Sequence, residues 1–306
     1  MSWVYEMTGK DSSHHVLVPE VVLLAPLPGH LKKRFSNALV MMNEQLEKNW
    51  TWEQIARHCA ISPAHFHRQF KSLFNETPGH YLSRLRLQKA TDHLLNNQRL
   101  SVTEIAQYCG FSSSQAMGKA LKRQLGVTAR AIQNMAINGT PRETGELLMK
   151  LAQPSECPDG SAVEELLAET IPAELIWLPK RTARTVRVKS ADWDDLYDQF
   201  GDDIGNLMVL TPIAQLNHSW QLIEATVCDW SGDVSQHDLV LPEGHYLCCE
   251  VLIATPAAYL AALEGLFQIA DQRGLDVVAD GLLVEQILGG SEKEGGIFAF
   301  QIPVLE

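Results

Sequence analysis

The chain has 306 residues, 45% of them hydrophobic, which is enough for two domains that each bury a core. Its longest apolar run near the N-terminus is EVVLLAPLPG at residues 20–29, which contains two prolines and lacks both a basic flank and a small-residue cleavage site. The run therefore predicts neither a signal peptide nor a membrane span. We expect a cytoplasmic protein with no membrane partner.

The formal net charge of −12 is unevenly distributed along the chain. Residues 31–142 hold 16 Lys and Arg against 6 Asp and Glu, whereas residues 171–306 hold 7 against 21. A basic half attracts polyanions and an acidic half repels them, so nucleic acid is expected to bind the first half.

The cysteine and histidine patterns indicate neither a disulfide nor a metal site. The six cysteines contain no CxxC pair, and a chain of this length does not need disulfides to fold, so we expect reduced thiols. His65 and His67 lie two residues apart on a predicted helix, where side chains point about 200° apart and cannot share a zinc ion. No metal and no other cofactor is expected.

Residues 1–34 carry no pattern that predicts a role and form an N-terminal extension, for which a tail and a segment packed on either domain both stay open. A helix is predicted next, over residues 35–46, where apolar residues recur at helical spacing. This helix should complete the core of the elements that follow it.

The segment TWEQIARHCAIS, from residue 51, is repeated as SVTEIAQYCGFS from residue 101. Each copy opens with a capping box, whose two side chains satisfy the free N–H groups of a helix start. The two boxes are Thr51 with Gln54 and Ser101 with Glu104. The apolar residues behind each box follow helical spacing, so each copy predicts a short helix.

A second helix is predicted after a short turn in each copy. Ser62 and Pro63 are typical of a helix start, while Asn75 and Gly126 tolerate the left-handed backbone of a helix end. Each helix has one apolar face, formed by Phe66, Phe70 and Phe74 in the first copy and by Met117, Leu121 and Leu125 in the second. Helix, turn and helix with an outward basic face is the helix-turn-helix arrangement.

A helix over about residues 79–97 is expected to connect the two units. Its length would be ~28 Å at 1.5 Å per residue, close to the ~34 Å of one turn of DNA. The two second helices could then enter successive major grooves on one side of a duplex.

The segments HFHRQFKSLFNETPGHYLSRLRLQKA and IAQYCGFSSSQAMGKALKRQLGVT resemble the DNA-binding domain of AraC/XylS transcription regulators. The resemblance extends over about a third of the chain and indicates a tandem helix-turn-helix domain at residues 35–137. It implies a non-enzymatic regulator or activator that binds double-stranded DNA and has RNA polymerase as a partner. The DNA-contacting positions that it implies are Ala64, His67, Arg68 and Lys71 in the first unit, and Ser114, Gln115, Lys119 and Lys122 in the second.

The second unit departs from the family pattern at Gly118 and Lys119. A glycine weakens a helix by up to ~1 kcal/mol relative to alanine. Lysine lacks the planar fork with which arginine bonds both O6 and N7 of guanine, a contact worth ~1 to 3 kcal/mol of discrimination. The first unit is therefore expected to set most of the sequence specificity and the second to add affinity.

Residues 138–170 contain the Gly, Pro and Ser clusters of a linker, NGTPRETG and PSECPDGS, with room for a short helix between the clusters and another, AVEELLAE, after them. Residues 171–306 alternate strand-like and helix-like stretches in a strand-helix-strand-strand order that occurs twice, starting with a predicted hairpin in AELIWLPKRTARTVRV. The predicted protein is thus multidomain, with an all-α tandem helix-turn-helix domain followed by an α+β domain that has a groove between its halves.

The segments PEGHYLCCEVL, LLVEQIL and FQIPVL are similar to the GyrI-like effector domain, and the order of the two domains resembles the Rob-type branch of AraC/XylS regulators. Glu285 lies within an apolar run, and a buried carboxylate without a partner costs several kcal/mol, so it either faces solvent or serves a ligand. The resemblance implies a small cationic or amphipathic effector at this glutamate. The aromatic residues that could line its pocket are Trp177, Trp220, Tyr246, Tyr259 and Phe298.

Two alternatives stay open for the acidic half. Some GyrI-like domains resemble hydrolases, in which case Glu285 would act as a general base, although the sequence offers no Ser/His/Asp or Cys/His arrangement. The acidic domain could instead bind another protein and serve as an adaptor tethered to DNA.

Overall fold

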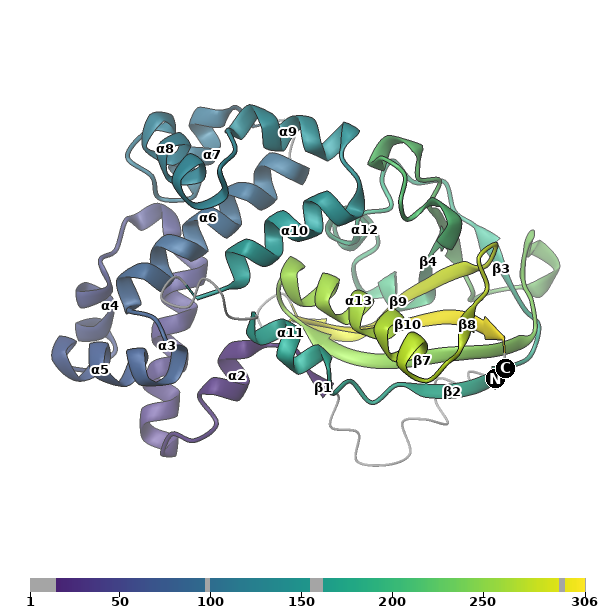
Figure 1. Ribbon diagram of the computed structural model, residues 1–306, viewed down its shortest axis with the longest axis horizontal. Coiled ribbons are helices and arrows are strands. Elements are labelled where there is room, and N and C mark those ends of the chain that lie inside the picture. Colours follow the sequence, from purple (N-terminus) through teal and green to yellow (C-terminus); the bar gives the residue numbers. More distant parts are fainter. Residues whose placement is uncertain (1–14, 97–99, 155–161, 292–294, 306) are drawn as a thin grey trace. The chain divides into compact units, whose positions relative to one another are not determined.

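The computed structural model describes residues 15–96, 100–154, 162–291 and 295–305 (Figure 1). The chain divides into two compact parts. We call residues 18–166 together with 215–223 the helical domain, and the remaining described residues the sheet domain. The sequence segments that form the two domains are therefore interleaved.

The helical domain is a succession of short helices, most of which begin at a polar capping residue. In chain order they are α2 (Pro19–Leu23), α3 (Gly29–Glu44), the 3-10 turn η1 (Leu46–Lys48), α4 (Trp52–His58), α5 (Pro63–Phe74), α6 (Pro78–Asn96), α7 (Val102–Tyr108), α8 (Ser114–Leu125), α9 (Ala129–Asn138), α10 (Pro141–Ala152) and the start of α11 (Val163–Ala168).

The starts predicted for α4 and α7 and the ends predicted for α5 and α8 are confirmed. Thr51 accepts the N–H of Gln54 at 3.4 Å and Ser101 accepts that of Glu104 at 3.2 Å, with both return bonds of the capping boxes present. α5 and α8 end in left-handed residues, with φ of 53° at Asn75 and 76° at Gly126. The local rules for helix termini hold here because the terminal residues satisfy backbone groups within one turn.

Two separate hydrophobic cores lie along the connecting helix α6. The first takes α6 residues up to Leu85 and packs them against α3, α4 and α5, including the three phenylalanines of α5. The second takes α6 residues from Leu87 onward and packs them against α7, α8, α9 and α10. Each helix-turn-helix unit is thus built on its own half of α6.

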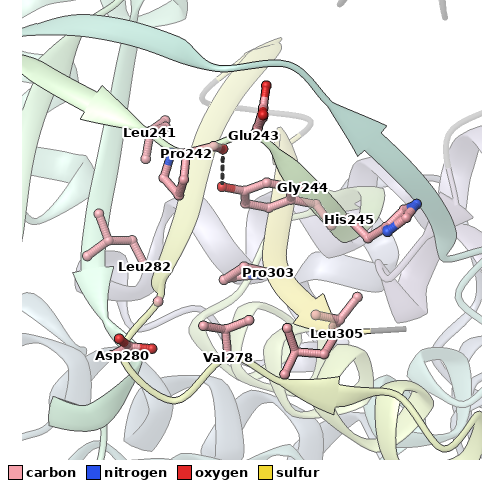
Figure 2. Close-up of a pocket in the computed structure, with 13 residues that line it drawn as sticks. Leu241, Pro242, Glu243, Gly244, His245, Val278, Asp280, Leu282, Pro303 and Leu305 are labelled. Carbon is pink, nitrogen blue, oxygen red and sulfur yellow. Dashed lines mark hydrogen bonds between the residues drawn. The ribbon is translucent and has the colours of Figure 1, made fainter.

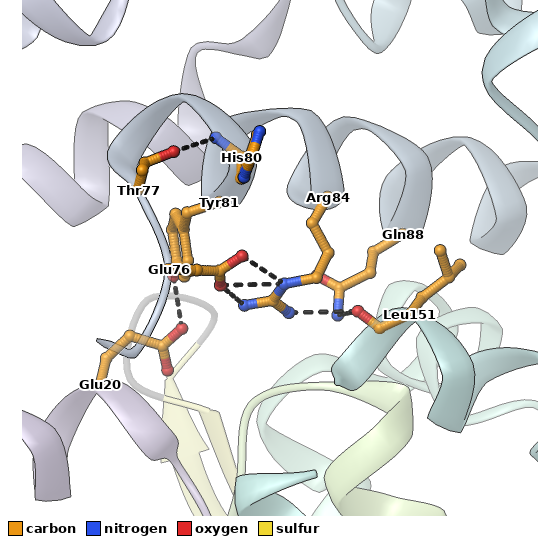
Figure 3. Close-up of polar contacts among 8 residues, drawn as sticks. All are labelled: Glu20, Glu76, Thr77, His80, Tyr81, Arg84, Gln88 and Leu151. Atoms are coloured by element: carbon orange, nitrogen blue, oxygen red, sulfur yellow. Dashed lines mark hydrogen bonds and ion pairs between the residues drawn. The ribbon is translucent and has the colours of Figure 1, made fainter. Parts of the chain in front are cut away.

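Polar contacts fix α6 to its neighbours (Figure 3). Arg84 makes an ion pair of 2.5 Å with Glu76, whose side chain is fully buried. Arg84 Nη1 and Gln88 Nε2 each donate to the carbonyl oxygen of Leu151 at 3.1 Å, and this carbonyl lies in the last turn of α10. The Tyr81 hydroxyl donates to Glu20 of α2 at 2.7 Å. Both α2 and α10 are therefore attached to the connecting helix.

The structure adds detail to the predicted linker and to the N-terminal extension. Residues 141–152 form α10, which begins with a third capping box, Thr140 with Glu143, and buries Leu147 and Leu151 in the second core. Within residues 1–34, His15–Val16 form strand β1, α2 packs on α6 through Glu20, and α3 begins at Gly29 rather than at residue 35. Residues 1–14 and 155–161 lie outside the described residues.

The sheet domain is a ten-stranded sheet with two helices. Its elements are β1 (His15–Val16), β2 (Glu174–Leu178), β3 (Arg181–Thr185), α12 (Trp193–Phe200), β4 (Leu207–Pro212), β5 (Thr226–Asp229), β6 (Leu239–Leu241), β7 (Gly244–Ile253), α13 (Pro256–Gln272), β8 (Asp276–Val277), β9 (Leu282–Ser291) and β10 (Gly295–Leu305). The strand order is β1-β7-β10-β9-β4-β5-β3-β6, with β2 on β7 and β8 on β10.

The strand-helix-strand-strand order occurs twice, as β3-α12-β4-β5 and as β7-α13-β9-β10, the second with the two-residue strand β8 between α13 and β9. α13 packs against β7 (Figure 1). Its buried residues include the small residues Ala258, Ala262 and Gly265. The predicted hairpin at the start is wrong, because β2 pairs with β7 while β3 pairs with β5 and β6. These long-range pairings have no local sequence signal.

Residues 215–223, which leave β4 and return to β5, belong to the helical domain. The backbone N–H of Trp220 donates to the carbonyl oxygen of Gly139 at 2.9 Å, and its indole N–H donates to Thr144 at 3.2 Å. Gln221 adds a bond of 3.4 Å to Asn138. This segment is therefore held on α9 and α10. Across all described residues, no helix is both long and apolar enough to traverse a bilayer.

Candidate nucleic-acid interface and ligand site

The polar face of α5 points away from the first core. Ala64, Arg68 and Lys71 are exposed, whereas the phenylalanines one or two positions away are buried. His67 is half-buried, because its ring lies 5.5 Å from the ring of Trp52 in α4. An arginine on this face has the reach and the planar geometry to bond the edge of a base.

The corresponding face of α8 is also open. Gln115, Lys119 and Lys122 are exposed and Ser114 is half-buried, while Met117 and Leu121 are fully buried behind them. Lys122 donates from Nζ to the carbonyl oxygen of Gly126 at 2.6 Å, which stabilises the C-terminus of its own helix. An ammonium has three donors, so this bond leaves two for a phosphate.

Glu285 lies at the centre of an aromatic cluster in the sheet domain. It is 4% exposed, and its carboxylate accepts the hydroxyl of Tyr259 in α13 and the indole N–H of Trp193 in α12, the latter at 3.3 Å. Phe298 of β10 lies 5.8 Å from Trp193 and 5.7 Å from Tyr259, between ring centroids. A carboxylate among ring faces is an arrangement that favours an organic cation.

Burial raises the pKa of Glu285 above its ordinary value, and the two hydrogen bonds from Tyr259 and Trp193 oppose this rise. Burial, together with the negative charge of Glu285, raises the pKa of Tyr259 well above its ordinary value, so this hydroxyl remains a donor. A cation that entered the cluster would lower the pKa of Glu285, because an opposite charge favours the ionised form.

The other predicted pocket residues do not join this cluster. Trp177 of β2 is 52% exposed, and Trp220 belongs to the helical domain. Tyr246 lies on the opposite side of the sheet from Glu285. Glu285 of β9 is paired with Phe300 of β10, which is paired in turn with Cys249 of β7. Tyr246 is three residues before Cys249, and side chains alternate between faces along a strand.

Tyr246 instead lines a cavity of about 340 Å³ at one end of β7 and β10 (Figure 2). Its hydroxyl donates to the carbonyl oxygen of Pro242 at 3.1 Å, and its ring lies under the guanidinium of Arg181 at 4.9 Å. The apolar lining includes Leu241, Val278, Leu282 and Leu305. Over the part of the chain that the structure describes, no group of three or more His, Cys, Asp or Glu could hold a metal ion.

Sequence reasoning missed Trp193 as a neighbour of Glu285. The two residues are 92 positions apart, and the window ADWDDLYDQF predicts only an amphipathic helix. The contact depends on the pairing of β4 with β9, where Val209 lies opposite Glu285. No local pattern could have indicated it.

Comparisons with known proteins bear on the helical domain. A family model described as a helix-turn-helix domain matches residues 55–135. The HTH-type transcriptional regulator ArgR of Pseudomonas aeruginosa is 31% identical over 116 residues, covering 38% of this chain and 35% of that protein. AlkR of Acinetobacter baylyi, another HTH-type transcriptional regulator, is 40% identical over 89 residues, covering 29% of each chain. Residues 55–135 are an AraC-type helix-turn-helix domain.

The AraC-type domain is the part of the chain that these relatives share, since the chain spans only 29% to 35% of their length. Among solved structures, the DNA-binding domain of AdpA in complex with a target DNA is 31% identical, with a TM-score of 0.30, over 32% of this chain and 86% of that chain. Both α5 and α8 lie within the matched residues of the AraC-type domain.

The AraC-type domain exposes basic residues that sequence reasoning did not select, among them one in a recognition helix. Arg123 follows Lys122 in the last turn of α8 and is exposed. Its position beside Lys122 in a basic segment was the available signal. It can serve as a further phosphate contact.

Proposed function

We propose that the chain is a sequence-specific DNA-binding transcription regulator that inserts α5 and α8 into successive major grooves. What supports this most directly is that α6 carries one helix-turn-helix unit at each end, each with its core behind a polar exposed face. α6 has 19 residues and is therefore ~28 Å long, close to the ~34 Å of one DNA turn. RNA polymerase is the protein partner that the resemblance to AraC/XylS regulators implies.

The two recognition helices contribute differently in this proposal. Arg68 bonds a guanine through two donors, with Ala64 and His67 beside it, while Lys119 makes a single-donor contact. Lys71 and Lys122 neutralise phosphates, with Ser114 and Gln115 at the N-terminal end of α8. Because each neutralised phosphate releases counterions, affinity should fall steeply with salt.

The experiment is a selection from a random duplex library at near-physiological salt, with wild type, Arg68→Ala and Lys119→Ala. The expected wild-type result is two sequence elements about one helical turn, ~10 base pairs, apart. Arg68→Ala should erase the preference within one element. Arg142→Ala is the matched control, because Arg142 is an exposed arginine of α10 outside both recognition helices. Enrichment of no sequence would contradict the proposal.

The same proposal assigns regulation to a small organic cation at Glu285, in a GyrI-like sheet domain of a Rob-type regulator. The buried carboxylate among Trp193, Tyr259 and Phe298 supports it. Tetraphenylphosphonium should raise the melting temperature of the wild type and not that of Glu285→Gln, and neutral triphenylphosphine oxide should change neither. An equal shift in both proteins would contradict a charge-based site.

A further inference from the structure

The two helix-turn-helix units meet beside Arg86 in the middle of α6. Leu85 belongs to the first core and Leu87 to the second, so Arg86 lies where the cores change over. From the first unit, η1 and the residues after it reach this place, and α7 with its following turn reaches it from the second. The contacts that hold the two units at a fixed relative position are therefore those around Arg86 and those along α6 itself.

Gly110, in the turn between α7 and α8, makes the closest approach at this junction. Its φ is 72°, and it is buried. A Cβ built on Gly110 would lie 2.2 Å from the carbonyl oxygen of Leu46 and 3.1 Å from Nε of Arg86. The first distance is far below any van der Waals contact. Leu46 cannot withdraw without disturbing the first core, in which its side chain is buried.

The first unit contains the same turn without this contact, and so serves as an internal control. Ala60 occupies the equivalent position after α4, with a φ of 56° and the same backbone bond to the residue three positions earlier. Ala60 is exposed, and its Cβ fits. A left-handed backbone in this turn therefore does not require glycine. The requirement at position 110 comes from the approach of Leu46.

Arg86 fills the space beside this contact. Its Nη2 donates to the carbonyl oxygen of Trp50 at 3.4 Å, and Trp50 belongs to the segment between η1 and α4. Among the described residues its Nε is buried without a hydrogen-bond partner, and burial lowers the pKa of the guanidinium. Burying part of a cation costs desolvation energy. That Arg86 is nevertheless placed at this junction indicates that the shape and the donors of its guanidinium are needed there.

We propose that Gly110 and Arg86 are positioning residues that lock the two helix-turn-helix units at one separation and angle. The lock sets the spacing between the two DNA elements that the protein selects. This inference rests on the proposed DNA-binding function. Inserting one base pair between the elements rotates one of them by about 35° and moves it by about 3.4 Å, which a locked pair of recognition helices cannot follow.

The experiment measures affinity for duplexes in which the two selected elements keep their spacing or are separated by one additional base pair. Wild type should bind the longer duplex at least about tenfold more weakly, a loss of about 1.4 kcal/mol. Gly110→Ala should reduce this ratio to about threefold or less, because the added Cβ pushes the junction apart. Arg86→Met keeps an unbranched side chain as far as the position of Nε and removes the guanidinium with its donors, and should reduce the ratio in the same direction.

Gly126→Ala is the matched control. Gly126 has a φ of 76°, close to that of Gly110, but a Cβ built there meets no atom within 4 Å. The backbone strain is thus the same and the clash is absent, so the spacing ratio should stay at the wild-type value. Circular dichroism melting shows which variants are folded. Arg86→Met carries the test if Gly110→Ala does not fold.

The outcomes are distinguishable. Folded Gly110→Ala and Arg86→Met proteins that keep the wild-type ratio would overturn the lock while leaving DNA recognition intact. A ratio that falls equally in Gly126→Ala would attribute the effect to strain and also overturn it. A wild-type protein that selects one element alone would contradict the two-unit function itself, and the lock with it.

Discussion

The two helix-turn-helix units share one backbone plan and differ in how their cores are filled. In the first, α5 contributes stacked aromatic rings, with Phe70 and Phe74 4.3 Å apart, and α3 covers them. In the second, α8 contributes Met and Leu, and α9 and α10 complete the core. Helix capping and apolar periodicity determine this shared backbone arrangement. Both are compatible with aromatic or with aliphatic core residues. Neither unit closes its core alone, since each depends on a helix outside its own helix-turn-helix.

The largest expected effect comes from the two cores. Phe70→Ala should lower the free energy of unfolding by ~3 to 5 kcal/mol and Leu121→Ala by ~2 to 5 kcal/mol, because each removes a fully buried side chain and leaves a cavity. Urea unfolding followed by circular dichroism measures both. Tyr108→Ala is the control, since Tyr108 is 63% exposed. Two transitions in a single variant would show that the cores unfold separately.

The free energy of unfolding should depend on pH through one buried carboxyl group, that of Glu164. Glu164 of α11 is 4% exposed, and burial raises its pKa from 4.5 to about 7, opposed by Arg84. A carboxyl whose pKa is higher in the folded than in the unfolded state contributes stability below pH 4.5 that is lost as pH rises through 7.

Glu164→Gln should therefore raise the free energy of unfolding at pH 8 by roughly 3 kcal/mol relative to its effect at pH 4.5. Thermal or urea unfolding at the two pH values measures the difference. Glu146→Gln, an exposed carboxylate of α10, should show no such dependence. If the two variants respond alike, Glu164 is not buried in solution.

The capping boxes test whether the two copies are energetically equivalent. Thr51→Ala and Ser101→Ala should each cost ~0.5 to 2 kcal/mol, because each removes the acceptor of a helix-start N–H. Chemical denaturation gives both values. A much smaller cost for one of them would mean that its helix is held by packing rather than by its cap.

The smallest expected effect is a stabilisation in the second unit. Gly118 lies inside α8, and a Cβ built there meets no atom within 4 Å. Gly118→Ala should raise the free energy of unfolding by up to ~1 kcal/mol, since alanine loses less backbone entropy in a helix. A destabilised Gly118→Ala protein would show that the position needs glycine for a contact that the structure does not contain.

Sequence reasoning was most successful where the signal was local. The starts of α4, α5 and α7 and the ends of α5 and α8 depend on residues within one turn, and these were predicted. The start of α10 was not predicted, although its box, Thr140 with Glu143, follows the same rule, because nearby Gly and Pro are typical of a linker. Trp193 beside Glu285 and Leu46 beside Gly110 depend on tertiary pairing, which no window of sequence contains.

The segment 215–223 has a consequence for how the protein is made. It is the last part of the helical domain to be synthesised, and it follows β2, β3 and β4 of the sheet domain in the chain. A ribosome therefore releases the site on α9 and α10 well before it delivers Trp220. The recognition helices can fold early in translation, whereas the domain that carries them is finished only when more than two thirds of the chain has left the ribosome.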